Sequence, residues 1–233
     1  MNLVDVGILA VLGLGFLLGW YKGFLTTALS LASYVVSWVA AFAFYGNLAS
    51  FVMEKAQLGN TLLYFTAGAE KLSDMSVANA DISVLTAEKI TESVSNLPTP
   101  IGNMILENIQ NQAFAAQGIT TLSDYFNQTI INLSINLICF LIIFFAVKLV
   151  CMFVIGLVDA VSRLPVLKQF NQVLGGALGV LQAAVLIAVV FAVVPIAMSV
   201  LPLESFYSMI QGSLLGRLFL NGNIIFSVLK SVM

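Results

Sequence analysis

Long stretches of uncharged, mostly apolar residues alternate with short charged junctions along this chain. Four stretches contain no Asp, Glu, Lys or Arg: residues 6–21, 23–53, 125–147 and 169–203. A helix needs roughly 20 apolar residues to cross the hydrocarbon core of a bilayer. The pattern therefore predicts four spanning helices, over residues 3–19, 24–45, 130–157 and 173–194.

The basic residues in the short loops predict the topology. Basic residues favour the cytoplasmic side of a membrane, and Lys22, Arg163 and Lys168 lie in the two short loops. We therefore expect both loops in the cytoplasm and both chain ends outside. The chain then divides into a transmembrane hairpin (1–45), an extracytoplasmic helical segment (46–125), a second pair of spanning helices (126–200) and an amphipathic C-terminal tail (201–233).

The extracytoplasmic segment has helix signals of its own. Residues 86–97 have the pattern of a short amphipathic helix, and Thr99-Pro100 opens another, since proline is favoured at the first helical position. Thr121 and Asp124 have the spacing of a capping box that starts the third spanning helix. Residues 51–69 are predicted to form a further helix on the membrane surface.

Composition places the whole chain in a membrane. Of its 233 residues, 60% are hydrophobic and 9% are charged, whereas a soluble domain carries roughly a quarter charged residues. We therefore predict an all-α, polytopic membrane helical bundle with four transmembrane helices. Its environment is the lipid bilayer, and the net charge of −2 gives no reason to expect nucleic acid as a partner.

Two predicted helices carry stripes of small residues. Residues four apart lie one above another on a helix, and in lipid such stripes let helices associate by close van der Waals contact. We interpret them as packing faces within one four-helix protomer, and the alternative is an oligomeric pore. The first stripe consists of Gly7, Gly15, Gly19 and Gly23, and the second of Gly175, Gly176, Gly179 and Ala183.

The first hairpin contains two charged residues with more than one possible role. Asp5 lies near the start of the first helix, where a carboxylate stabilises the helix dipole. Its alternative is a proton or ion site, because ionisable groups in spans often mark pathways. Lys22 sets the topology in our interpretation, and binding of an anionic lipid is the alternative.

The second pair of spanning helices has polar residues at its predicted cytoplasmic end. Asp159 and Arg163 are four apart and are expected to form an exposed ion pair, with an anchor for a cytoplasmic partner as the alternative. Asn171 is predicted to cap the N-terminus of the fourth helix. Lys148 falls near the cytoplasmic boundary, where its stem can extend toward water.

Several classes of chemistry lack their usual residues. The chain has no histidine, the commonest general base and metal ligand. Its two cysteines lie in one apolar run without a CxxC pair, and neither GxSxG nor GxxxxGK[ST] occurs. We therefore expect no catalytic residues, no metal and no cofactor.

Several motifs resemble those of a known family. Asn2-Leu-Val-Asp5 precedes the first apolar helix, and Gly19-Trp-Tyr-Lys22-Gly23-Phe24 follows it. Asp159-Ala-Val-Ser-Arg163-Leu164-Pro165 comes before Phe170-Asn171 and the second glycine stripe. Over about residues 1–200 the chain resembles the colicin V production protein family. The resemblance implies a bacterial inner (cytoplasmic) membrane protein associated with production or export of a peptide toxin.

These observations lead to three functional expectations. The first is a membrane component that supports toxin production, toxin export or envelope function without catalysis of its own, and that self-associates or joins another membrane protein. The second is an oligomeric channel for small solutes or ions. The third is a membrane anchor that recruits a soluble partner.

Overall fold

Four long helices form the body of the protein. The computed structural model describes residues 2–56, 72, 74–161, 168–200, 204–222 and 225. All four long helices are apolar and long enough to cross a membrane, and the described residues contain no strand. The predicted all-α membrane fold is therefore confirmed. The helices are α1 (Leu3–Lys22), α2 (Phe24–Ala56), α8 (Leu122–Val161) and α9 (Lys168–Val200).

The spanning helices are longer than the sequence pattern indicated. α8 has 40 residues, which at ~1.5 Å per residue makes it about 60 Å long, twice the ~30 Å hydrocarbon core. α2 continues to Ala56, and α9 passes through Pro195 and ends at Val200. Bilayer thickness sets how many apolar residues a helix needs, but it does not make the helix stop where the hydrocarbon ends.

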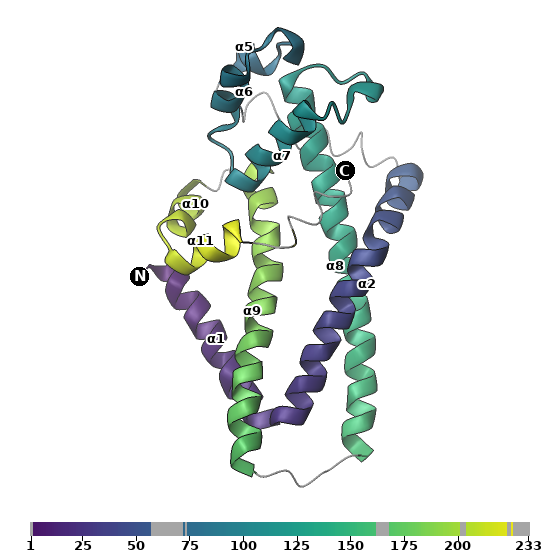
Figure 1. The fold of residues 1–233 in the computed structure, drawn as a ribbon, viewed down its shortest axis with the longest axis vertical. Helices are drawn as coiled ribbons and strands as arrows, with labels where there is room; N and C mark the ends of the chain where they lie inside the picture. The colour runs from purple at the N-terminus through teal and green to yellow at the C-terminus, as the bar shows by residue number, and fades with distance from the viewer. Residues whose placement is uncertain are drawn as a thin grey trace.

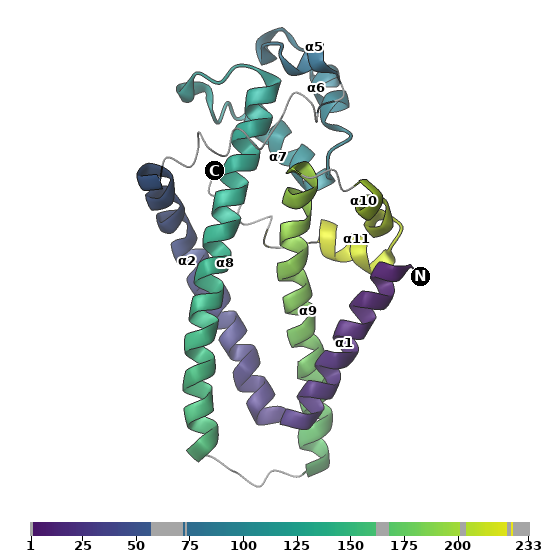
Figure 2. The same ribbon diagram turned by 180° about the vertical axis from the view of Figure 1, so that it is seen from behind.

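The helices are arranged around the turn between α1 and α2. In Figures 1 and 2, α1 and α2 meet at one end of the molecule and diverge from it, with α9 between them and α8 alongside α2. Gly23 makes the turn with φ of 82°, a backbone conformation that side-chain-bearing residues rarely adopt. We call this end of the bundle the Lys22 end.

Short helices cover the opposite end of α8 (Figure 1). They are α5 (Met75–Ala78), η1 (Ile82–Val84), α6 (Ala87–Val94), α7 (Thr99–Gln110) and η2 (Ala115–Gln117). The Thr86 hydroxyl caps α6, and Pro100 lies in the first turn of α7. Ile101 and Ile105 of α7 are fully buried in the same core as Phe126 of α8. This packing positions the short helices on the long one.

Thr121 and Asp124 interact at the start of α8. The Asp124 N–H donates to Thr121 Oγ1 at 3.2 Å, and the Thr121 hydroxyl donates to Asp124 Oδ2 at 2.7 Å. The predicted surface helix at 51–69 coincides with α2 as far as Ala56, and residues 57–69 lie outside the described part of the chain.

Candidate functional site

α1 and α9 touch through their backbones. A Cβ placed on Gly15 would lie 2.6 Å from the Cβ of Ala183, and one placed on Gly19 would collide with the carbonyl oxygen of Gly175. A Cβ on Gly179 would collide with the carbonyl oxygen of Gly15. We call these five residues the glycine seam. The two small-residue stripes thus meet each other inside one chain.

The remaining residues of the two stripes lie in different surroundings. Gly176 contacts the ring of Phe16, where a Cβ would come within 2.6 Å of the ring. Gly23 lies against the side chain of Asn171. Gly7 faces open space, because a Cβ there would meet no atom within 4 Å. Among the described residues, Gly7 therefore has no packing partner.

Asn171 caps a different helix from the one that we predicted. α9 already begins at Lys168, and the side-chain oxygen of Asn171 accepts a hydrogen bond from the Phe24 N–H at 2.7 Å. The first N–H groups of a helix have no partner within it. Asn171 supplies this partner to the first N–H group of α2. The prediction that Asn171 caps the N-terminus of α9 was therefore wrong.

Asp5 joins α1 to the start of a short helix that follows α9. One carboxylate oxygen accepts from the Asn2 N–H at 3.0 Å and completes a capping box for α1. The other accepts from the Ser213 hydroxyl at 2.6 Å and from the Leu215 N–H at 3.0 Å. Ser213 caps helix α11 (Leu214–Asn221), which follows α10 (Glu204–Gln211). The carboxylate thereby holds the start of α11 beside α1.

Of the other predicted charged residues, Lys22 is the one whose side chain the structure describes. Lys22 is exposed in the last turn of α1. Asp159 belongs to α8, but its side chain lies outside the described part of the structure, as does Arg163 entirely. Their ion pair therefore stays a prediction.

A cavity of about 560 Å³ opens beside the glycine seam. α1, α2, α8 and α9 all contribute to its walls, and Gly15, Gly19 and Gly179 bring backbone to its surface. Its polar lining residues are Lys22, Thr26, Ser30, Tyr34, Lys148 and Gln182. None of the described lining residues is acidic. We call it the lysine cavity.

Lys148 is the buried cation of this cavity. Its side chain is only 7% exposed. The ammonium donates to the Ser30 carbonyl oxygen at 3.0 Å and to the Ser33 hydroxyl, and it lies 3.5 Å from the centroid of the Tyr34 ring. These partners are uncharged, so they solvate the ammonium without neutralising it. Contrary to our expectation, the lysine extends toward α2 and not toward water.

Serine hydroxyls on α2 make this arrangement possible. The Ser33 hydroxyl donates to the Ser30 carbonyl oxygen at 2.6 Å, and the Ser37 hydroxyl donates to the Ser33 carbonyl oxygen at 2.6 Å. A serine hydroxyl in a helix can donate its hydrogen to a backbone carbonyl in the preceding turn and still accept a hydrogen bond from another donor. The lone lysine of α8 and this serine spacing were the sequence signals for the site.

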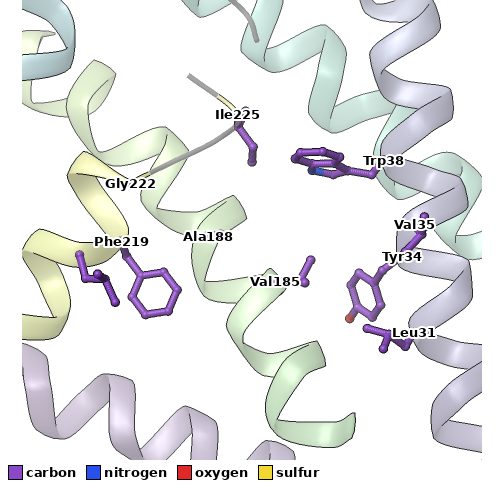
Figure 3. A pocket seen from close by; sticks show the side chains of 10 residues that line it. Leu31, Tyr34, Val35, Trp38, Val185, Ala188, Phe219, Gly222 and Ile225 are labelled. Carbon is purple, nitrogen blue, oxygen red and sulfur yellow. The ribbon is translucent and has the colours of Figure 1, made fainter. Parts of the chain in front are cut away.

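A second cavity, of about 460 Å³, has a different lining (Figure 3). Trp38, Val35 and Leu31 come from α2, and Val185 and Ala188 from α9, with Phe219 of α11 opposite them. Tyr34 lines both cavities. None of the described residues that line this second cavity is charged. We call it the apolar cavity.

Metal chemistry has no visible site in the described part of the chain, since no group of three His, Cys, Asp or Glu residues is placed to hold an ion. Cys139 is buried in α8, and Cys151 is half-buried further along it. The arrangement offers binding by charge and hydrogen bonds.

Comparison with known proteins identifies the family. The family model described as Colicin V production protein matches residues 4–74 and 112–223. The match includes every described residue of the lysine cavity and omits residues 75–111, which contain α5 to α7. No curated protein and no solved structure matches the chain. With four helices able to span a membrane and a family match over most of its length, the chain is a multi-pass membrane protein that belongs to the colicin V production protein family.

Proposed function

We propose that the protein works in the bacterial inner membrane as a non-catalytic component that supports toxin production, toxin export or envelope function. Its working part in this proposal is the lysine cavity, which binds a polar ligand group within the membrane. The family match and the four spanning helices support the general role.

The observation that carries the proposal is the buried ammonium of Lys148. A charged group is costly inside a bilayer, and ionisable residues in spans therefore tend to have a functional reason. Here the ammonium lies at the wall of a cavity, and its described partners are a carbonyl oxygen, a hydroxyl and an aromatic ring. A bound ligand with negative charge would neutralise it.

The orientation of the cavity follows from the proposed topology. Lys22 lies at the end of α1 and lines the cavity. Basic residues favour the cytoplasmic side, so in our proposal the lysine cavity lies in the cytoplasmic half of the membrane. The extracytoplasmic side then carries the short helices α5 to α7.

Self-association, if it is part of the function, needs a surface other than the glycine seam. Gly15, Gly19 and Gly179 are already covered within one chain. The outer face of α1 around Gly7 stays open. We therefore favour a protomer that contains its own binding cavity over a pore assembled through the seam.

Complementation tests the proposal. The host strain carries a peptide-toxin operon and lacks its own gene for this family member. It is complemented separately with the wild-type chain, with Lys148→Met and with Lys89→Met, each at the same level in the membrane. Released toxin and survival in detergent are measured. We expect Lys148→Met to lower at least one readout and Lys89→Met, an exposed change in α6, to lower neither. Unchanged readouts in the strain without the gene would contradict the general role, and full activity of Lys148→Met would contradict the role of the cavity.

A further inference from the structure

We propose that the lysine cavity binds one anionic phospholipid, with the phosphate beside Lys148 and Lys22 and an acyl chain along the apolar wall. The inference rests on the proposed function of the same cavity and adds the chemical class of its ligand. Four features of the cavity support it: charge, hydrogen-bonding groups, depth and size.

Charge selects an anion. Lys148 and Lys22 both line the cavity, and no described lining residue is acidic. The described contacts of the Lys148 ammonium are uncharged. Because electrostatic attraction is stronger where water is scarce, a phosphate that enters this cavity gains more from the buried ammonium than it would from an exposed lysine.

Hydrogen-bonding groups surround the same region. Ser30 and Thr26 line the cavity on α2, and Gln182 lines it on α9. The Gln182 side-chain nitrogen is buried and has no hydrogen-bond acceptor among the described residues. An unsatisfied buried donor costs free energy. A phosphate oxygen beside Gln182 would accept from it after a rotation of the amide.

Along α1, the lining of the cavity becomes apolar with increasing depth from the helix end. Ser30, which accepts from Lys148, is six residues beyond Phe24 and therefore ~9 Å along α2 from its start. On α1, Lys22 lies at the helix end, while Val11 lines the cavity about 16 Å further into the span. The apolar lining residues are Val11, Leu14, Leu18, Met152, Ile155 and Leu186. On α8, Met152 and Ile155 lie between Lys148 and the Lys22 end, so an apolar wall runs beside the polar groups. An acyl chain whose headgroup lies at Lys148 and Lys22 can follow the apolar wall along α1 toward Val11.

The size and access of the cavity suit part of a lipid. Its volume of about 560 Å³ falls in the range of roughly 300–1,000 Å³ that is common for small-molecule sites. Leu14, Leu18 and Met152 are exposed at its edge, so an acyl chain can pass between them and the surrounding bilayer. Lys148 is buried and Lys22 is exposed, so the headgroup can reach the ammonium groups while the acyl chain remains partly in lipid.

Lipid binding to the purified full-length chain tests the inference. Delipidated protein in detergent is titrated with dioleoyl phosphatidylglycerol, with dioleoyl phosphatidylcholine and with inorganic phosphate, and bound lipid is counted by native mass spectrometry. We expect phosphatidylglycerol to bind at least about fivefold more tightly than phosphatidylcholine, the effect of roughly one lysine near an anionic surface. Equal binding of both lipids would overturn the charge argument. Displacement of phosphatidylglycerol by inorganic phosphate would show a free-anion site and overturn the lipid assignment.

Two matched pairs of variants locate the site. Lys148→Met should abolish the preference for phosphatidylglycerol, and Lys89→Met, outside the membrane, should keep it. Leu14→Trp narrows the cavity without touching Lys148, whereas Leu17→Trp changes a neighbouring residue that does not line it; Leu14 and Leu17 are 59% and 62% exposed. Lipid binding should fall only in Leu14→Trp. A preserved preference in folded Lys148→Met, or equal binding by the two tryptophan variants, would overturn the inference.

The binding assay and the complementation assay fail separately. A wild-type chain that binds both lipids equally, together with inactive Lys148→Met, would overturn the lipid ligand and keep the functional role of the cavity. A chain that prefers phosphatidylglycerol, together with fully active Lys148→Met, would keep the lipid site and overturn its role in the proposed function.

Discussion

α1 and α9 meet through their backbones, whereas α2 and α8 meet through aromatic rings. In the first pair, the carbonyl groups of Gly15 and Gly175 occupy the space that side chains would need on the opposite helix. In the second pair, Phe42 and Tyr45 contact Phe140 with ring centroids 6.2 and 6.4 Å apart, and Tyr34 lies 6.1 Å from Phe144.

The difference shows two ways to hold helices together without a water-driven core. Lipid chains are as apolar as the side chains they surround, so helices gain stability from contact and packing. The glycine seam brings the two main chains into direct contact and leaves no room for a larger side chain at its glycines. The aromatic contact places large side chains between the helices, and these tolerate exchange for another apolar group of similar volume.

The largest expected effect comes from a side chain in the seam. Gly19→Leu should prevent folding, because even its Cβ would collide with the Gly175 carbonyl group, and a backbone cannot move aside as a side chain can. The measurement is the yield of monodisperse protein in detergent. Gly7→Leu is the matched control, since a Cβ at Gly7 meets nothing within 4 Å. Similar yields for the two variants would refute the backbone contact.

A large but smaller effect is expected from truncating a ring in the aromatic contact. Phe140 is 1% exposed, and Phe140→Ala should lower the free energy of unfolding by about 3–5 kcal/mol, the usual cost of a buried Phe→Ala change. Phe140→Leu should cost clearly less. Unfolding in a denaturing detergent gives both values. Equal costs for Ala and Leu would show that filling volume is not what the rings contribute.

The turn that connects the two helix pairs should give an intermediate effect. Asn171→Ala removes the acceptor of the Phe24 N–H and should cost about 0.5–2 kcal/mol, as the loss of a helix cap does. Asn171→Asp keeps an acceptor oxygen and should therefore retain most of the stability that Asn171→Ala loses. The same unfolding assay applies, and the proposed cap is wrong if alanine and aspartate behave alike.

The smallest effect is expected outside both contacts, at the short helices. The Ser83 hydroxyl and N–H hold the pKa of Asp81 below its ordinary value of 3.8. A carboxyl group whose pKa is lowered in the folded state stabilises that state at pH values above 3.8. This contribution is lost as the pH falls through the folded-state pKa. The measurement is hydrogen exchange of the η1 amides in the wild type and in Ser83→Ala over a range of pH. The wild type should be better protected near neutral pH, and the difference between the two proteins should vanish in acid. A constant difference between the two proteins would contradict the linkage.

The sequence allowed the membrane architecture to be predicted because charge is so costly in lipid. The uncharged runs marked four helices that the structure confirms, and the motifs around Lys22 and Asn171 indicated the family that the comparison confirms. The motif at Thr121 and Asp124 predicted where α8 begins. Other helix ends were less predictable, because α2 continues to Ala56, beyond the length that a bilayer requires.

The site could not be predicted in the same way, since its contacts join distant parts of the chain. Asparagine commonly caps the helix that directly follows it, but the partner of Asn171 is Phe24, which is 147 residues away. Lys148 looked like a boundary residue until the structure placed its ammonium on Ser33, 115 residues before it. Local spacing indicates which groups need partners, and only tertiary packing decides which partners they find.

The hydrogen bond between Asn171 and Phe24 also has a consequence for biosynthesis. The ribosome completes the first two helices long before it adds Asn171, so during that interval the leading N–H of α2 must rely on water or lipid headgroups. The Asn171 contact at the bend can therefore form only after the helix that carries Asn171 has been synthesised.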